Sequence, residues 1–158
     1  MILGIISDSH DNLPKLKKAI ALFNKKNTSL VLHAGDYVAP FAVNMIEDNL
    51  KCEYAGVFGN NDGEKEGLTD KSKGKIKSHR LELEKFGRKI LLIHDISDRE
   101  IDFSKYDIVI YGHSHKPSME KRNNCWVINP GECGGWLSGK SSVVTLDLIS
   151  DTAKLHIL

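Results

Sequence analysis

The sequence predicts an α/β fold of the α+β type, a sandwich of two mixed β-sheets with helices on the outside. Up to residue 58, apolar runs alternate with amphipathic helical segments, a pattern typical of parallel strands joined by crossover helices. Beyond residue 77, apolar residues alternate with polar ones between short turns, a pattern typical of antiparallel strands. A chain of 158 residues can bury its own core, so we expect one domain, residues 1–158.

The first half of the chain contains three predicted strands and two predicted helices. The apolar run Ile2–Ile6 is dense enough for a strand buried on both faces. A helix is expected to start at Asn12, which can cap it, with Pro14 in its first turn, and to run to about Lys26. The remaining elements of this half are a strand at 30–32, a helix at 40–50 with Phe41, Met45 and Ile46 facing inward, and a strand at 53–58.

The second half contains mainly predicted strands. The segment 63–77 carries lysines but no periodicity, and we predict a solvated loop there. A hairpin follows, with strands around 81–83 and 90–93 joined at Gly87–Arg88. The remaining elements are a weak helix at 98–105, a buried strand at 108–111, and two further hairpins at 118–128 and 143–158, with turns at Asn123–Asn124 and Ser150–Asp151.

The composition argues against several classes of protein. The 22 basic residues nearly balance the 21 acidic ones without a like-charged block, so neither a nucleic-acid stripe nor a polybasic membrane patch is indicated. The apolar runs are far shorter than the ~20 residues of a membrane helix, and no signal-peptide pattern precedes the first strand. The three cysteines have no C-x-x-C spacing and fit a reducing compartment. We therefore expect a cytoplasmic protein without a membrane partner, and homo-oligomer formation stays open.

Residues that can bind metal ions follow five of the predicted strands. Open α/β sheets place their sites at the carboxyl ends of strands. Oxygen and imidazole donors without a thiolate favour manganese, iron, zinc or nickel over copper(I). One such ion takes about four to six ligands, whereas a larger set with a bridging water suits two ions. The candidate ligands are Asp8 and His10, Asp36, Asn60, His94, and His113 and His115.

Local features of these motifs support a shared site. Asp8 and His10 are two residues apart, which on an extended segment places both side chains on the same side. Asp36 stands alone at its strand end, and its two carboxylate oxygens make it the natural bridge between two ions. A glycine that lets the backbone approach metal or substrate precedes three of the candidates: Gly35, Gly59 and Gly112.

The ordered motifs resemble those of calcineurin-like metallophosphoesterases. Over its whole length the chain is similar to the small, cap-less bacterial and archaeal phosphodiesterases of the YfcE-like group. The resemblance implies a four-layer αββα sandwich, the metallophosphoesterase fold, with two divalent ions, Mn²⁺ first and Ni²⁺, Fe²⁺, Zn²⁺ or Mg²⁺ as alternatives. The motifs that carry it are Asp8-Ser9-His10, Gly35-Asp36, Gly59-Asn60-Asn61-Asp62, the isolated His94, Gly112-His113-Ser114-His115, and the late turn Asn129-Pro130-Gly131-Glu132-Cys133.

The resemblance also assigns the metal ligands by motif position. Each ion would have four ligands, and one carboxylate would serve both ions. The first ion would be held by Asp8, His10, Asp36 and His115, and the second by Asp36, Asn60, His94 and His113.

Two positions depart from the family pattern. Asn61 stands where many members have a histidine that protonates the leaving oxygen, and an amide cannot deliver a proton at neutral pH. Asp62, which would orient that histidine, is thereby left without its usual role. Asp95 follows His94 where the family usually has glycine, and it could crowd or acidify the rim of the site.

These features predict a metal-dependent phosphodiesterase acting on a small-molecule phosphodiester. A metal-bridging hydroxide would attack phosphorus in line while the ions stabilise the charge on the phosphoryl oxygens. The candidate catalytic residues are Asp36 and Asn61, the latter as a hydrogen-bond donor to a phosphoryl oxygen. Diesters with good leaving groups are favoured because the sequence offers no strong general acid.

Two other functions stay open. One is a phosphomonoesterase, including a protein phosphatase, and the other is a non-enzymatic scaffold, since a eukaryotic retromer subunit shares this fold with a degraded metal site. Residues outside the motifs are expected to be structural. His33 would lie behind the ligands or in the core, and His79 and His156 would be ordinary surface or sheet residues. Trp136 would be a core or rim aromatic, or else a wall of the substrate approach.

Overall fold

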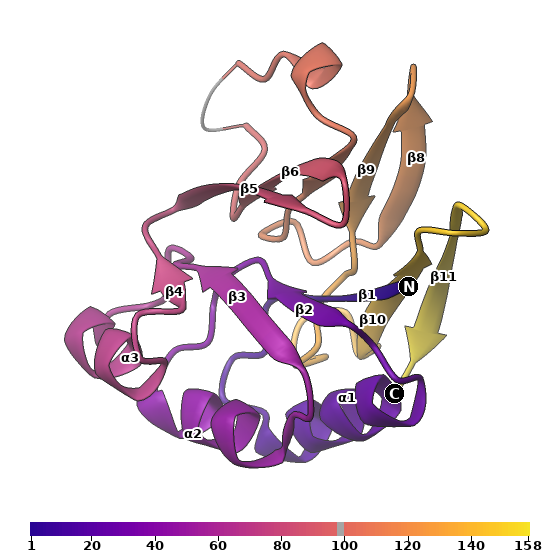
Figure 1. Ribbon diagram of the computed structural model, residues 1–158. Coiled ribbons are helices and arrows are strands. Elements are labelled where there is room, and N and C mark those ends of the chain that lie inside the picture. Colours follow the sequence, from indigo (N-terminus) through magenta and orange to yellow (C-terminus); the bar gives the residue numbers. More distant parts are fainter. Residues whose placement is uncertain (98–99) are drawn as a thin grey trace.

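A computed structural model describes residues 1–97 and 100–158, which form two β-sheets packed face to face (Figure 1). The first sheet has six strands in the order β11-β10-β1-β2-β3-β4, and the second has five in the order β5-β6-β7-β9-β8. The strands of the first sheet are β1 (Ile2–Ile6), β2 (Leu30–His33), β3 (Glu53–Val57), β4 (Ile76–Lys77), β10 (Ser142–Asp147) and β11 (Thr152–Ile157). Those of the second are β5 (Arg80–Lys85), β6 (Arg88–Ile93), β7 (Ile108–Ile110), β8 (Ser118–Arg122) and β9 (Cys125–Asn129).

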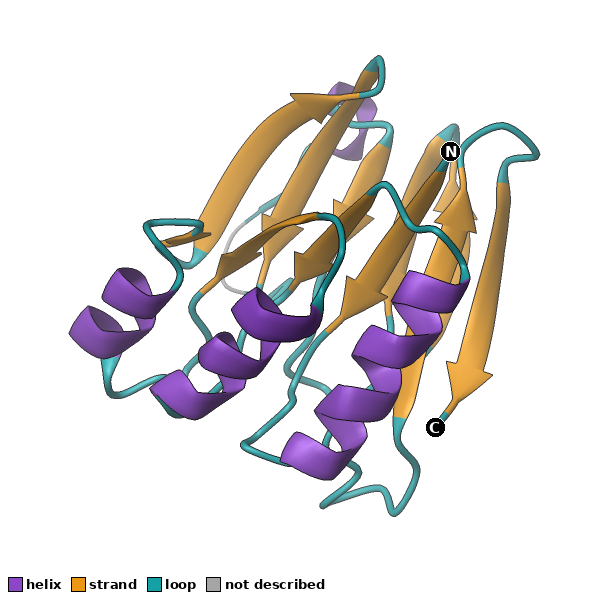
Figure 2. Cartoon of the chain, turned by 60° about the horizontal axis from the view of Figure 1, so that its bottom comes forward, coloured by secondary structure: helices purple, strands orange, loops and turns teal. Residues whose placement is uncertain are grey.

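Three helices cover the outer face of the first sheet (Figure 2). They are α1 (Leu13–Lys25), α2 (Pro40–Asn49) and α3 (Lys65–Lys71). On the outer side of the second sheet, the described residues form the short 3₁₀ helix η1 (Phe103–Lys105) and its flanking segments. Among the described helices, none is long and apolar enough to cross a membrane.

The main core lies between the two sheets. Leu3 and Leu32 from the first sheet pack in one cluster with Leu92 and Ile110 from the second, and all four side chains are fully buried. Burial on both faces explains why β1 is apolar throughout and why β2 is apolar up to His33. The helical layer has its own cluster, in which Phe23 of α1 is buried against the first sheet. The prediction of two mixed sheets flanked by helices is therefore confirmed.

The pairing of the strands confirms most predicted elements. β1, β2 and β3 are parallel neighbours, and the three hairpins are antiparallel. The second half is less uniform than predicted, because β7 pairs in parallel with both β6 and β9. Of the helix predicted at 98–105, only η1 is present in the described part, and Asp98 and Arg99 lie outside the described residues.

Two predictions of local structure were wrong. The segment 63–77 is not a loop, because it contains α3 and β4. α3 is seven residues long and buries only Leu68, and β4 has two residues, so neither is long enough to give a periodic pattern. Phe41 does not face inward and is 62% exposed, because α2 packs through Ala42, Val43 and Ile46.

The close approach of β3 to Tyr37 gives a stability prediction. A Cβ at Gly56 would lie 1.8 Å from the Tyr37 hydroxyl, and the fully buried Tyr37 ring is stacked on His33. We expect Gly56→Ala to lower the free energy of unfolding by about 1–3 kcal/mol through overpacking, measured by urea denaturation.

The matched control removes the Tyr37 hydroxyl, with which the new methyl group would overlap. Among the described residues, the Tyr37 hydroxyl has no hydrogen-bond partner, so Tyr37→Phe leaves no other group unpaired. In the Tyr37→Phe background, Gly56→Ala should lower the free energy of unfolding by less than half of the amount by which it lowers it in the wild-type background. An equal loss in both backgrounds would contradict this explanation.

Candidate metal centre

The candidate ligands come together where strands of both sheets end. Asp8, Asp36 and Asn60 follow β1, β2 and β3 of the first sheet. His94 follows β6 of the second sheet, and the turn with His113 and His115 follows β7. The parallel strands β1, β2 and β3 end at the same edge of their sheet, so these loops are neighbours.

The loop after β1 converges on the site by a different route from the predicted one. β1 ends at Ile6, and Asp8 and His10 are not extended, since their φ angles are +52° and +42°. The backbone N–H groups of Asp8 and His10 donate to the carbonyl oxygens of Gly35 and Asp36. These bonds hold the loop against the one after β2, so both side chains still point to the same place.

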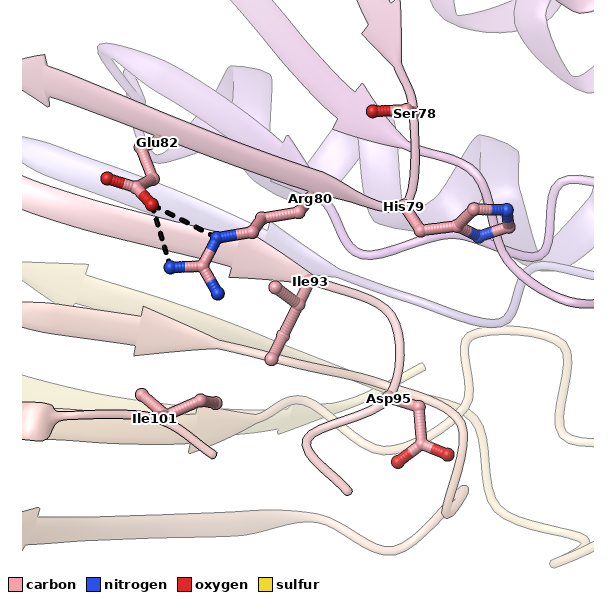
Figure 3. A pocket seen from close by; sticks show the side chains of 7 residues that line it. All are labelled: Ser78, His79, Arg80, Glu82, Ile93, Asp95 and Ile101. Atoms are coloured by element: carbon pink, nitrogen blue, oxygen red, sulfur yellow. Dashed lines mark hydrogen bonds and ion pairs between the residues drawn. The ribbon is translucent and has the colours of Figure 1, made fainter. Parts of the chain in front are cut away.

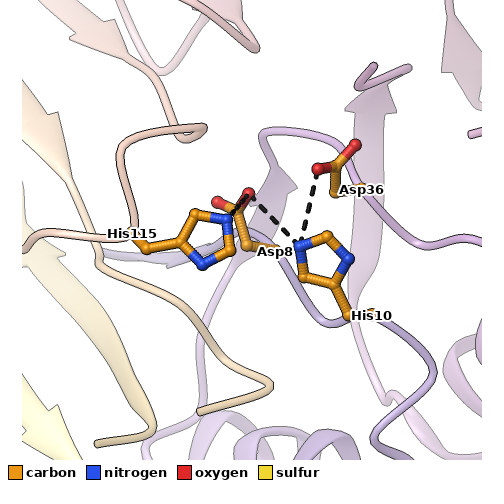
Figure 4. A group of neighbouring side chains, drawn as sticks. All are labelled: Asp8, His10, Asp36 and His115. Atoms are coloured by element: carbon orange, nitrogen blue, oxygen red, sulfur yellow. Dashed lines mark ion pairs between the residues drawn. The ribbon is translucent and has the colours of Figure 1, made fainter. Parts of the chain in front are cut away.

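Four side chains form the first half of the site (Figure 4). One potential ligand atom from each of Asp8, His10, Asp36 and His115 lies within 4.8 Å of the other three. His10 Nε2 is 3.5 Å from Asp36 Oδ2, and His115 Nε2 is 3.4 Å from Asp8 Oδ1. Both carboxylates are fully buried, and burial raises the pKa of Asp8.

The second half of the site converges on Asn60. Its Oδ1 is 2.8 Å from His94 Nε2 and 2.9 Å from His113 Nδ1. His94 Nε2 is also 3.6 Å from Asp36 Oδ2, so Asp36 lies between the two halves. The structure thus brings all seven sequence-predicted ligands into one cluster, with Asp36 at its centre.

The residues present fit divalent cations. In the described part of the chain, Asp8 Oδ1 and His10 Nε2 are buried and have no hydrogen-bond partner. His94 Nδ1 lies 2.7 Å from the Ala34 carbonyl oxygen, which can only accept, so Nδ1 donates a hydrogen to it. Nε2 of His94 faces Asn60 Oδ1 at 2.8 Å, and both atoms are of kinds that bind divalent cations. Imidazole and oxygen donors are typical ligands of first-row divalent ions.

Asp62 has a structural role that sequence reasoning missed. Its buried carboxylate accepts hydrogen bonds from the backbone N–H groups of Gly59, Asp36 and Val38, at 2.7, 3.0 and 2.7 Å. It therefore ties the loop after β3 to the loop after β2. Gly59 is required in this contact, because a Cβ there would lie 2.0 Å from Asp36 Oδ1.

Glu132 is a second residue whose role the sequence did not reveal. Its side chain is fully buried, and Oε2 accepts a hydrogen bond from His115 Nδ1 at 3.0 Å. This bond leaves Nε2 of His115 facing Asp8. Burial alone would raise the pKa of Glu132, but hydrogen bonds from Ser138, His115 and Leu137 outweigh it and lower the pKa to about 2. The only signal in the sequence was the family-like turn that contains this glutamate.

Asn61 and Asp95 lie at the rim of the site. Asn61 donates its backbone N–H to Asp36 Oδ1 at 2.8 Å and its side-chain amide to Asp36 Oδ2 at 2.7 Å. Asp95 accepts hydrogen bonds from the backbone and hydroxyl of Ser97, and its Oδ2 is 3.6 Å from His113 Nε2. Asn61 therefore orients the central carboxylate, and Asp95 places a negative charge beside the second half of the site.

The remaining histidines and Trp136 occupy the positions expected for non-ligands, with one exception. His33 is fully buried beneath the site, where desolvation lowers its pKa to about 3, and it pairs with the Ser9 hydroxyl. His156 bonds Thr145 across β10 and β11. Trp136 is exposed and donates its indole N–H to the His10 carbonyl oxygen. The exception is His79, which lines a hollow with Asn60 and His94.

A model of the calcineurin-like phosphoesterase superfamily domain matches residues 1–151. The chain belongs to this superfamily. It is 39% identical over 155 residues to phosphodiesterase MJ0936 of Methanocaldococcus jannaschii, a match that covers 93% of each protein. The resemblance inferred from the motifs is thus confirmed.

Solved structures agree with this assignment. A structure of an archaeal phosphodiesterase is 35% identical, covers 100% of both chains and has a TM-score of 0.86. The phosphoesterase Yfce from E. coli is 20% identical, with a TM-score of 0.74 over 99% of this chain and 98% of that one. A Vps29 variant from Entamoeba histolytica is 19% identical, with a TM-score of 0.68 over 100% and 98% of the chains. At these lower identities, the last two indicate the shared fold alone.

The low pKa of Glu132 gives a prediction for acid stability. A carboxyl group whose pKa is lower in the folded state stabilises that state above its ordinary pKa and loses this effect as the pH falls. With EDTA present, the free energy of unfolding of the wild type should therefore fall by about 2 kcal/mol more than that of Glu132→Gln between pH 6 and pH 3. Glu84→Gln, a change at an exposed position, should lose as much free energy of unfolding between pH 6 and pH 3 as the wild type, measured by urea denaturation at each pH. If Glu132→Gln and the wild type lost the same free energy of unfolding over this pH range, the low pKa of Glu132 would be contradicted.

Proposed function

We propose that the protein is a phosphodiesterase that depends on two divalent cations. The first would be held by Asp8, His10, Asp36 and His115, and the second by Asp36, Asn60, His94 and His113. Membership of a hydrolytic family and the similarity to an archaeal phosphodiesterase support the reaction. Carboxylate, amide and imidazole donors without a thiolate suit manganese, iron, zinc or nickel, and we take manganese first because of the resemblance to the family.

The observation that carries the proposal is the position of the Asp36 carboxylate. Its side chain is 1% exposed, and its Oδ2 is 3.5 Å from His10 Nε2 and 3.6 Å from His94 Nε2. These two rings belong to the two different sets of ligands. A buried carboxylate between imidazole rings is energetically costly unless positive charge compensates it, and a pair of cations would do so.

The chain's own residues organise the reaction around this carboxylate. When bound, the cations would supply a hydroxide at neutral pH and stabilise the charge that develops on the phosphoryl oxygens. Asn61 holds both oxygens of Asp36, and its amide is near enough to the centre to donate to a phosphoryl oxygen as well. Because an amide cannot protonate a leaving oxygen, diesters with good leaving groups should react fastest.

Removal of the metal tests the proposal directly. With Mn²⁺ present, the protein should hydrolyse bis(p-nitrophenyl) phosphate, and EDTA should abolish the release of p-nitrophenolate until Mn²⁺ is added back. Asp36→Asn should lower kcat about 100-fold or more, because it removes the shared carboxylate. Asp70→Asn in α3 is the matched control and should leave kcat unchanged. Activity that survives EDTA, or an active Asp36→Asn protein, would rule out this mechanism.

The choice of substrate separates the two alternative functions. A phosphomonoesterase would have a higher kcat/KM for p-nitrophenyl phosphate than for its bis-ester, and we expect the opposite. A scaffold would hydrolyse neither compound even when elemental analysis shows bound metal. The proposed small-molecule diesterase requires metal-dependent turnover of the bis-ester.

A further inference from the structure

A groove with a volume of about 650 Å³ is lined by the side chains drawn in Figure 3. It extends along the strand ends of β5 and β6, and we call it the side groove. His79 and Asp95 line the side groove and also line a smaller hollow together with Asn60, His94 and His113. Because both hollows include these two residues, the side groove adjoins the second half of the metal centre.

One part of the side groove is apolar. Ile93 is the last residue of β6, and Ile101 is half-buried and packs against the same cluster of side chains (Figure 3). Ser78, at the entry to β5, also lines the groove and is exposed. Two isoleucines suit the face of a flat ring, which buries apolar surface without requiring hydrogen bonds.

Another part of the side groove is polar and held in place. Arg80 donates from Nε and Nη2 to Glu82 Oε1, at 3.0 and 2.7 Å, and from Nη2 to the Tyr106 hydroxyl at 2.7 Å (Figure 3). These three bonds fix the plane of the guanidinium group and leave Nη1 outside them. A fixed guanidinium next to a carboxylate offers donors and acceptors to the edge of a heterocycle.

We propose that the side groove binds the substituent that stays on phosphorus, and that this substituent is a flat heteroaromatic group such as a nucleobase. The proposal rests on the phosphodiesterase function proposed above. In-line displacement expels the leaving group opposite the attacking oxygen, so a group held beside the ions is the one that is retained. The volume of the side groove lies within the range of about 300–1,000 Å³ that is typical of small-molecule sites.

A second hollow on the same sheet shows why position matters. Its volume is about 760 Å³, and it shares Glu82 with the side groove. However, its other lining residues lie along β5 and β6, around η1 and in the turn between β8 and β9, and none of them lines the smaller hollow that contains Asn60, His94 and His113. Of the two large hollows, the side groove is therefore the one that can hold a group attached to phosphorus at the metal centre.

Two esters with the same leaving group test the proposal. Thymidine 5′-(p-nitrophenyl phosphate) and methyl p-nitrophenyl phosphate both release p-nitrophenolate, so their kcat/KM values differ only through the retained group. With Mn²⁺ present, the wild type should prefer the thymidine ester by about tenfold. Ser78→Phe, which fills the side groove, should lower kcat/KM for this ester about tenfold and for the methyl ester less than about twofold.

Further variants guard against misfolding and non-specific loss. Ile101→Ala trims the apolar wall and should lower the preference for the thymidine ester about threefold. The matched control is Ser150→Phe, in the turn between β10 and β11, and it should change neither value. That turn is remote from the site because Asp147 pairs with Ile2, whereas the site follows the other end of β1. Thermal unfolding of each variant checks that it is folded.

The possible results distinguish the side-groove proposal from the proposed phosphodiesterase function. Equal kcat/KM values for the two esters in the wild type, or equal losses of both in folded Ser78→Phe, would overturn the side-groove proposal and leave the phosphodiesterase function intact. Turnover of neither ester would contradict the phosphodiesterase function itself. In that case calorimetric binding of thymidine 5′-monophosphate decides: binding that Ser78→Phe abolishes supports a heterocycle site, and no binding overturns it.

Discussion

The burial of two carboxylates, Asp8 and Asp36, at the junction of the sheets is the constraint on which the site depends. Both residues are buried, and burial raises the pKa of Asp8 because it disfavours the charged form of the carboxyl group. Imidazole rings and backbone N–H groups surround both carboxylates, but neutral donors compensate a buried charge only in part. Bound cations would reverse the balance, because each carboxylate would then face a positive charge in a medium of low dielectric constant.

The backbone around these carboxylates has an uncommon conformation. The left-handed region, with positive φ, is uncommon for residues other than glycine, yet five of the seven candidate ligands adopt it. Asp62 and the loop-to-loop hydrogen bonds hold this conformation in place. Hydrogen bonds within the protein therefore define where the candidate ligand side chains lie. The five are Asp8, His10, Asp36, His113 and His115.

Much of the fold and all seven converging side chains followed from local patterns, because each ligand motif directly follows an apolar run. The features that failed depend on the tertiary structure. The partners of Asp62 lie up to 26 residues away, and Glu132 meets His115 across a separate loop. Asp8 and His10 converge as predicted, but through a left-handed backbone that side-chain spacing does not reveal. α3 is too short to have a period, and Phe41 shows that an apolar residue in a helix can lie on its exposed face.

The place of β1 in its sheet has a consequence for how the protein is made. β1 is synthesised before its two neighbours in the sheet, β2 and β10, and β10 begins only at Ser142. Until then one edge of β1 has no neighbouring strand. The carbonyl groups of Ser7 and Asp8 likewise lack their hydrogen-bond donors until Cys133 and Gly134 have been synthesised. The nascent chain therefore carries an open sheet edge, a known route to aggregation, while the residues between β2 and β10 are synthesised. The loop with Asp8 therefore takes its final form only after the segment with Cys133 and Gly134 has been synthesised.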